Sequence, residues 1–401
     1  MDFSSQAHPR PSERRSSIVF QWADGLVRLV LLAAALVILR PSADAPSDAH
    51  GKTAYGLLVA AGTLLGYFLL TKQEVRQLVK RATARQPLLM GLLPAALPAP
   101  ALALMPFEPT VDFAEVAFYL TLFVLPPSAV LLDQQERRRV DASLGVTIVA
   151  LPTLALLVQS NQSSELFALS GWDWALRAVM LLMPAALLLA MRVRQPRDQH
   201  FLRICGLLSA WLIVEFKAFP TVPLVGNGQR GYFDFAVLLL LAYTVAVGSQ
   251  EQVAISFVPT PRGLSAWAAN LGFAVALILP LGLATQPLTF QVDTWSAWDV
   301  LGRWLELFLF TALPREMFLR GVLLAHLVDN LRLSRLTAVV ATSALTALLL
   351  AAQMPQAWWG AAVGVVIGAF GGRAFLSTRN LTVPALLHAA LHWVVWLLFG
   401  N

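Results

Sequence analysis

The sequence predicts an all-α polytopic membrane protein in which about thirteen transmembrane helices cross the bilayer. Its 401 residues are 57% hydrophobic and 13% charged, whereas a soluble domain has about 25% charged residues. Apolar runs of about 20 residues recur along the chain, and a helix of that length crosses the hydrocarbon core. The loops between these runs alternate between basic and acidic, which is typical of a chain that crosses a membrane repeatedly.

The first apolar run, residues 25–39, is short, and the Ala-Asp-Ala sequence at 43–45 resembles a signal-peptidase site, so a cleaved signal peptide is one alternative. An uncleaved first helix is favoured because the run begins late in the chain and is followed directly by Arg40 and Pro41. The expected helices cover about residues 25–39, 54–71, 88–106, 113–132, 142–159, 174–191, 201–216, 233–249, 266–285, 300–328, 336–353, 357–376 and 383–399.

A change in composition divides the chain into three parts. Residues 1–17 are polar and basic, which predicts a cytoplasmic tail without regular structure. Residues 18–265 are expected to form an N-terminal transmembrane bundle, and residues 266–401 a C-terminal domain with a four-helix core, separated by a loop at PTPRG, 259–263. The first bundle lacks the acidic residues at depth that an ion pump or carrier needs, which argues against transport.

The charges of the loops predict an orientation. Net charge is +6, and this excess gathers in loops on one side, so it indicates topology and not nucleic-acid binding. The N-terminus is expected inside and the C-terminus outside a cytoplasmic membrane. Tryptophans at the ends of runs, Trp298, Trp358, Trp359 and Trp396 among them, are expected at the lipid headgroups. Basic loops lie at 72–86, 133–141, 192–203 and 329–335, and acidic loops at 107–115, 160–173 and 286–299.

The segment PREMFLRG, residues 314–321, places charged residues inside an apolar run. A charge at bilayer depth costs about 2.5 to 3.5 kcal/mol on insertion scales, so it is usually retained for function. Glu316 and Arg320 are four residues apart and share a helix face, which suits either a structural ion pair or a held catalytic carboxylate. Pro314 is expected to kink the helix and free a backbone carbonyl near residue 310.

The second polar cluster is HAALH, residues 388–392. His388 and His392 lie one helical turn apart, a spacing that lets two imidazoles share a metal, although packing histidines are the alternative. Together with Glu316 they make two histidines and one carboxylate, the ligand types of a catalytic zinc ion with an open position. The single cysteine, Cys205, leaves no disulfide and no cysteine metal site.

These two motifs resemble the CPBP family, also called Abi, which includes the CAAX prenyl endopeptidases. The resemblance covers about residues 295–400, where Glu316, Arg320 and Gly321 match the first motif and His388 matches the last. It implies an integral membrane endopeptidase, of bacterial origin, that acts on membrane-associated or lipidated peptides among membrane lipids. The charge pattern predicts no nucleic-acid partner, and no cofactor is certain, with zinc as one alternative.

Three positions depart from the family pattern. Arg315 stands where the family has the glutamate that activates water, and arginine cannot accept a proton. The histidine of the second motif is absent, because Gln353 or Ala351 takes its place, and His392 replaces an asparagine or aspartate. One interpretation keeps proteolysis. Glu316, held by Arg320, activates water, His388 stabilises the oxyanion, and Gln353 or His392 donates a further hydrogen bond. The alternative is an inactive pseudoprotease that acts as a membrane scaffold or chaperone.

Overall fold

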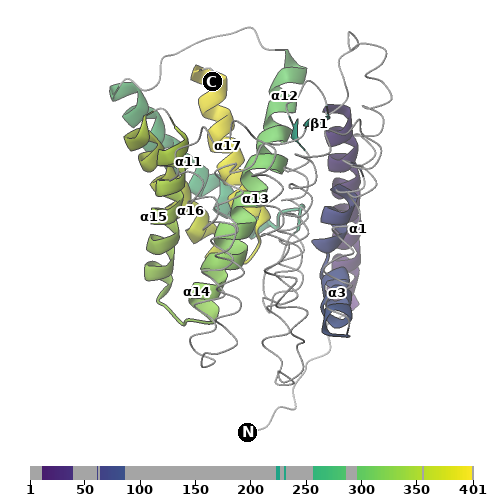
Figure 1. The fold of residues 1–401 in the computed structure, drawn as a ribbon. Helices are drawn as coiled ribbons and strands as arrows, with labels where there is room; N and C mark the ends of the chain where they lie inside the picture. Colours follow the sequence, from purple (N-terminus) through teal and green to yellow (C-terminus); the bar gives the residue numbers. More distant parts are fainter. Residues whose placement is uncertain are drawn as a thin grey trace, which may run out of the picture.

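Helices dominate the part of the chain that the computed structural model describes (Figure 1). The described residues are 11–38, 61, 64–85, 223–225, 230–231, 256–285, 296–354 and 356–399. The elements are α1 (Pro11–Ile38), α3 (Gln73–Arg85), β1 (Pro223–Val225), β2 (Arg230–Gly231), α11 (Pro261–Ala284), α12 (Ala297–Glu306), η2 (Leu307–Ala312), α13 (Leu313–Glu316), η3 (Met317–Leu324), α14 (Ala325–Asp329), α15 (Arg335–Gln353), α16 (Ala357–Thr378) and α17 (Thr382–Phe399).

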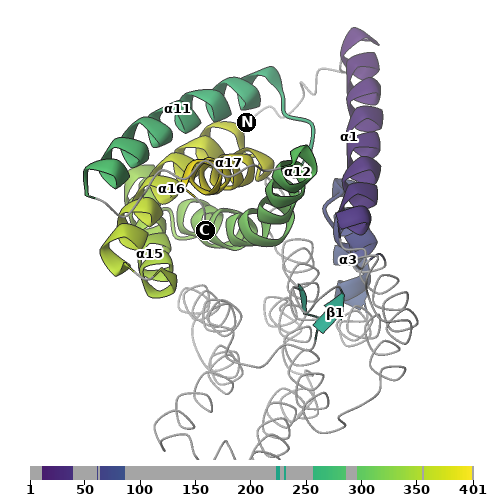
Figure 2. The same cartoon turned by 90° about the horizontal axis from the view of Figure 1, so that it is seen from above.

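The C-terminal helices enclose α17. Viewed from above, α17 lies between α11, α16 and α12 (Figure 2), and it contacts all three as well as η2. The α16 helix packs against α15 on one side and α11 on another. The predicted helices at 266–285, 336–353, 357–376 and 383–399 are therefore confirmed to within a few residues. The two short strands pair antiparallel, with Pro223 opposite Gly231.

Three of the described helices, α11, α15 and α16, are long and apolar enough to cross a membrane, and α17 is apolar but shorter. This agrees with a polytopic membrane protein. The predicted total of about thirteen spans is not tested, because the runs from 88 to 249 lie outside the described residues, as does Cys205. The predicted orientation also remains a prediction, since the basic loops at 133–141 and 192–203 lie there too.

The helix that carries PREMFLRG is continuous from 297 to 329 but changes its hydrogen-bond register around Pro314. Proline has no backbone N–H and its ring clashes with the carbonyl four residues earlier. The π-helical segments η2 and η3 lie on either side of α13, and the N–H of Leu313 donates to the carbonyl of Phe308, five residues back. Such π segments frequently mark functional sites. The predicted kink at Pro314 and the free carbonyl near residue 310 stay predictions.

Two N-terminal predictions need correction. The α1 helix begins at Pro11, so residues 11–17 are helical and not an unstructured tail. Proline is favoured in the first turn of a helix, where its missing N–H costs nothing. The predicted loop 72–86 is mostly the helix α3, because it consists largely of good helix formers such as Gln, Glu, Arg, Leu and Lys.

The segment PTPRG was predicted as a loop, but its last three residues are the first turn of α11. Thr260 is the N-cap residue, and its hydroxyl accepts a hydrogen bond from the N–H of Gly263 at 3.1 Å. Pro261 follows in the first turn, where proline is favoured. The loop that precedes α11 therefore ends at Thr260.

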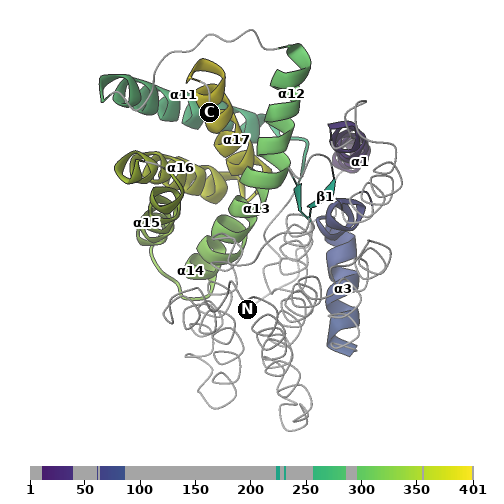
Figure 3. The ribbon, with the colours of Figure 1, turned by 45° about the horizontal axis from the view of Figure 1, so that its top comes forward.

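That loop is held by side chains from both ends of the chain. The carboxylate of Asp24 on α1 accepts from the N–H of Phe257 at 2.6 Å, and the side-chain amide of Asn380 donates to the carbonyl of Ser256 at 3.2 Å. Arg28 stacks over the ring of Phe257, with 4.7 Å between the guanidinium carbon and the ring centroid. The N-terminal helix α1, which contacts α12 (Figure 3), is thus tied to the C-terminal helices through residues 256–258.

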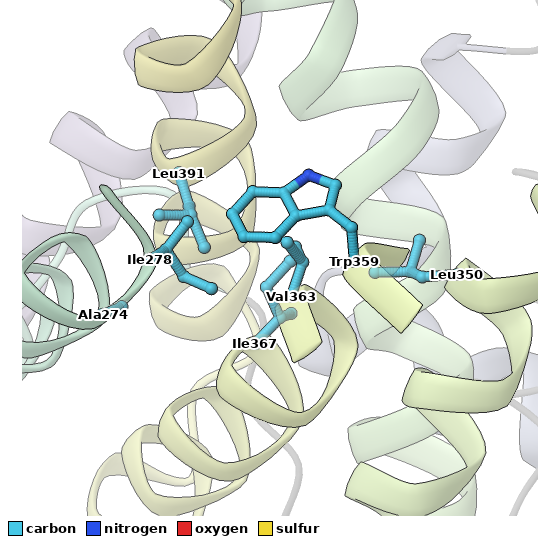
Figure 4. Close-up of a cluster of buried hydrophobic side chains, with 7 residues drawn as sticks. All are labelled: Ala274, Ile278, Leu350, Trp359, Val363, Ile367 and Leu391. Atoms are coloured by element: carbon cyan, nitrogen blue, oxygen red, sulfur yellow. The ribbon is translucent and has the colours of Figure 1, made fainter. Parts of the chain in front are cut away.

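Trp359 lies in the hydrophobic core and not at the lipid headgroups, so that prediction is wrong. Figure 4 shows its indole among side chains from α11, α15, α16 and α17, and it is 7% exposed. The neighbouring Trp358 is half exposed, as predicted for an anchor. Successive helical residues point about 100° apart, so adjacent tryptophans can lie in different surroundings, one in the core and one at the surface. The core cluster contains Ala274, Ile278, Leu350, Trp359, Val363, Ile367 and Leu391.

Glycines every four residues let α16 approach α15 closely. A Cβ added at Gly364 would lie 2.5 Å from the Cα of Ala347, and one at Gly368 would lie 2.5 Å from the Cα of Ser343. Small residues at this spacing are typical of closely packed membrane helices. The repeat of Gly360, Gly364, Gly368 and Gly372 is visible in the sequence and could have predicted the α15–α16 contact.

Gly364→Ala is expected to destabilise the protein by about 1–3 kcal/mol, because backbone atoms of α15 must move to admit the methyl group. Thermal unfolding of the purified full-length protein in detergent measures this. Gly272→Ala on α11 is the matched control, since nothing lies within 4 Å of a Cβ at that position. An equal melting temperature for both variants would contradict the close contact.

Candidate active site

Glu316 joins two other helical segments through its carboxylate. It lies at the end of α13 and is 0% exposed. Its Oε1 is 2.8 Å from Nδ1 of His388 on α17, and its Oε2 is 3.0 Å from Nε of Arg320 on η3. The first contact connects residues 72 positions apart in the chain. Oε1 is thus hydrogen-bonded to a buried side chain, whereas Oε2 lies in an ion pair and makes no hydrogen bond among the described residues.

Arg320 extends this network to a third helix. Its side chain is 0% exposed, and Nη2 donates hydrogen bonds to the carbonyls of Ile367 and Gly368 on α16 at 3.1 and 3.3 Å. Gly371 allows this approach, because a Cβ there would lie 3.3 Å from Nη2 of Arg320 and 3.6 Å from Oε2 of Glu316. The contacts of Arg320 therefore hold α16 against the helix that carries Glu316.

The hydrogen bond between Glu316 and His388 indicates the tautomer of the imidazole. Burial opposes the ionisation of Glu316 and the guanidinium of Arg320 favours it; when the carboxylate is ionised beside Arg320, it can only accept a hydrogen bond. Nδ1 of His388 must then carry the proton, which leaves Nε2 of the neutral ring with an open lone pair. Nε2 of His388 is buried and has no hydrogen-bond partner among the described residues.

His392 stands next to this ring. The two imidazole centroids are 5.0 Å apart with an angle of 32° between the planes. Nε2 of His392 is also buried without a hydrogen-bond partner in the described part of the chain. Buried polar atoms are rarely left unpaired, so the two nitrogens together indicate a place where a small polar group, such as a water molecule, binds.

Arg315 adds positive charge beside the two histidines. It is half-buried on α13, and its guanidinium is close enough to both imidazoles to act on them electrostatically. Arg303 of α12 acts in the same way on His392 and forms an ion pair with Glu306 at 2.9 Å. Fixed cations in a buried site favour negative charge on a bound group.

Glu316, His388 and His392 are not arranged as the ligands of one zinc ion, which was the alternative drawn from the sequence. Ligands of zinc each point at the metal from about 2.0–2.2 Å. Here Glu316 and His388 point at each other in a direct hydrogen bond. Among the described residues, no three His, Cys, Asp or Glu side chains converge as a metal site would require.

The structure brings together four of the residues that the sequence singled out. Glu316, Arg320 and His388 form the connected network, and His392 packs beside it. Gln353 lies at the C-terminal end of α15, where its backbone is described but its side chain is not. Sequence reasoning missed the α16 carbonyls and Gly371 as partners of Arg320. It also missed Tyr67, whose hydroxyl contacts the sulfur of Met317 at 3.6 Å.

Comparison with known proteins agrees with the motifs. No curated protein and no solved structure matched the chain. Residues 297–394 match the family model described as type II CAAX prenyl endopeptidase Rce1-like. The matched segment begins with α12 and includes both PREMFLRG and HAALH. The resemblance to the CPBP family is therefore confirmed: the C-terminal part of this chain is similar to the Rce1-like type II CAAX prenyl endopeptidases.

Proposed function

We propose that the C-terminal part of the chain is an intramembrane endopeptidase of the CPBP type in which His388 is the general base. The observation that carries this proposal is the buried hydrogen bond from Nδ1 of His388 to Oε1 of Glu316, at 2.8 Å, with Nε2 unpartnered within the described residues. A carboxylate that holds one imidazole nitrogen and leaves the other open is the arrangement that prepares histidine for proton transfer.

This division of roles differs from the one that the motifs predicted. Oε1 of Glu316 is taken up by the hydrogen bond with His388, and Oε2 lies in an ion pair with Arg320 at 3.0 Å although it makes no hydrogen bond among the described residues. The cation beside Oε2 makes it a weak base, so the proposal gives the proton transfer to His388. Arg315 cannot accept a proton. In the proposed mechanism Glu316 positions His388 and fixes its tautomer, while Arg320 positions Glu316. His388 is the catalytic residue.

The proposed reaction is peptide-bond hydrolysis. Nε2 of His388 takes a proton from water while the water oxygen bonds to the scissile carbonyl carbon, which forms a tetrahedral oxyanion. The positive charge of Arg315 and a hydrogen bond from His392 stabilise that oxyanion. The bond between carbon and nitrogen then breaks, and the proton on Nε2 passes to the leaving amine. The products are a carboxylic acid and an amine, and His388 returns to its neutral form.

The depth of the site limits the substrates. Glu316 and Arg320 are 0% exposed and the His388 side chain is 1% exposed, so water and peptide reach them only when the surrounding helices separate. A substrate of this site is therefore a peptide that is itself in the membrane or anchored to it. Lipidated peptides and single-span membrane peptides are the proposed classes.

The test is cleavage of such peptides by the purified full-length protein. Wild type is expected to cleave some of them, and His388→Ala to reduce the rate by about 10²–10⁴-fold, the usual contribution of a general base. His326→Ala on α14 is the matched control and is expected to retain cleavage, because the ring of His326 pairs with Asn330 and has no part in the proposed mechanism. Absence of cleavage by wild type, or equal rates for wild type and His388→Ala, would refute the proposal.

A pseudoprotease is the second candidate, and Arg315 favours it. This residue replaces the glutamate that activates water in the family, and the remaining polar side chains also form a closed, buried network that stabilises helix packing. The protein then binds a membrane partner without hydrolysis. Arg315→Glu separates the two candidates: an inactive wild type whose Arg315→Glu variant gains cleavage supports the pseudoprotease.

A further inference from the structure

A second feature of the chain, outside the candidate active site, is a cavity of about 610 Å³ between α1 and the helical segment 64–72. Its walls are mostly apolar. Leu26 and Leu29 of α1 are more than half exposed along it, and Leu65 and Leu69 face it from the other segment. Cavities that bind small ligands commonly have volumes of about 300–1,000 Å³. The size and lining suit an apolar chain.

The polar residues of the cavity are gathered toward one end. The loop charges predict that residues 1–17 and the basic segment 72–86 lie on the same side of the membrane. Gln21 and Lys72 then line the end near that surface, while Leu32 and Leu65 line the deeper end. An amphiphile with a polar headgroup and an apolar chain matches this gradient.

Lys72 gives the site its charge preference. Two cationic side chains line the cavity, but Arg28 is neutralised by Asp24, with 2.7 Å between Nε and Oδ2. The ammonium of Lys72 is half-buried and forms no ion pair or hydrogen bond with any residue that the structure describes. The adjoining helix α3 adds further basic residues near this end. A cation that has no partner among the described residues and lines an apolar groove favours an anionic headgroup.

The length of the cavity matches one leaflet of a bilayer. From Gln21 to Leu32 a helix rises about 16 Å, and half of the hydrocarbon core is about 15 Å. We propose that this groove binds one anionic phospholipid from the leaflet on the basic side, with an acyl chain along Leu26, Leu29 and Leu65 and its phosphate at Lys72. This site is independent of the proposed proteolysis.

The test compares phosphatidylglycerol with phosphatidylcholine of the same chains on the full-length protein in detergent, with bound lipid counted by native mass spectrometry. Phosphatidylglycerol is expected to bind about fivefold more tightly, the preference that one lysine near a membrane surface supplies. Lys72→Gln is expected to abolish this preference. Arg335→Gln, which removes an exposed cation at the start of α15, is the control and is expected to preserve it.

A second variant blocks the groove itself. Nothing lies within 4 Å of a Cβ at Gly25, so Gly25→Phe fills the cavity without a clash at Cβ and is expected to lower the affinity for both lipids. Gly272→Phe on α11 is its control, since that position is equally open and lies outside the cavity.

Three results would overturn the proposal: equal affinity of wild type for the two lipids, an unchanged preference in Lys72→Gln, or a change of oligomeric mass in Gly25→Phe. The last result, measured by light scattering, would assign the groove to a second copy of the chain. If Gly25→Phe does not fold, the comparison of Lys72→Gln with Arg335→Gln still tests whether Lys72 sets the preference for the anionic lipid.

Discussion

Arg320→Ala is expected to lower the free energy of unfolding by about 3–5 kcal/mol, the usual cost of removing one partner from a buried ion pair. The loss has two parts. Glu316 would remain buried with no cation at 3.0 Å from its Oε2, and the carbonyls of Ile367 and Gly368 would lose the donor Nη2. Thermal unfolding of the full-length protein in detergent is the measurement.

The ion pair between Arg379 and Asp329 provides the matched control. Its closest distance is 2.9 Å, against 3.0 Å for Arg320 and Glu316, but both side chains are more than one-quarter exposed, and such pairs contribute about 0–1 kcal/mol. Asp329→Asn is therefore expected to change the melting temperature little. Similar losses for Arg320→Ala and Asp329→Asn would show that burial does not set the strength of the Glu316 network.

Glu316→Gln is expected to reduce peptide cleavage by about 10²–10⁴-fold while the protein remains folded. An amide has one accepting oxygen and one donating nitrogen, so it cannot accept from both Arg320 and His388. If its oxygen stays with Arg320, its NH₂ group faces Nδ1 of His388 and forces the proton to Nε2. The open lone pair that the proposed mechanism uses would then be lost.

The tautomer of His388 can be observed directly. In ¹⁵N spectra of protein with labelled histidine, wild type is expected to show His388 protonated at Nδ1, and Glu316→Gln to show it protonated at Nε2. Glu306→Gln is the control, because Glu306 pairs with Arg303 and has no contact with His388 among its described interactions. If Glu316→Gln loses cleavage but its His388 signal is unchanged, the general base is Glu316 and not His388.

The same network gives the pseudoprotease candidate its physical basis. A buried ion pair is weak evidence for net stability, since well-packed apolar residues often replace one at no cost. The ion pair between Glu316 and Arg320 is therefore better explained by specificity: it fixes one arrangement of η3, α16 and α17. Both candidates need that arrangement, one to present Nε2 of His388 and the other to keep a partner-binding surface in shape.

Local spacing along the sequence was sufficient to determine the C-terminal helices and the pairing of Glu316 with Arg320. Apolar runs of the right length predicted α15, α16 and α17, because a membrane-spanning helix must satisfy its own backbone hydrogen bonds. Residues four apart share a helix face whatever surrounds them, which is why the ion pair between Glu316 and Arg320 could be predicted. The family motifs added His388.

Only the tertiary structure decided how these residues meet. The contact of Glu316 with His388 spans 72 positions, and it depends on how α13 and α17 are rotated toward each other. A helix that is apolar on all sides does not reveal which face turns inward, so Trp359 was expected at the lipid surface and lies in the core. The sequence alone determined only that a carboxylate and two histidines are present. Packing decided that Oε1 of Glu316 is hydrogen-bonded to His388, that Oε2 lies beside Arg320, and that Nε2 of His388 has no hydrogen-bond partner among the described residues.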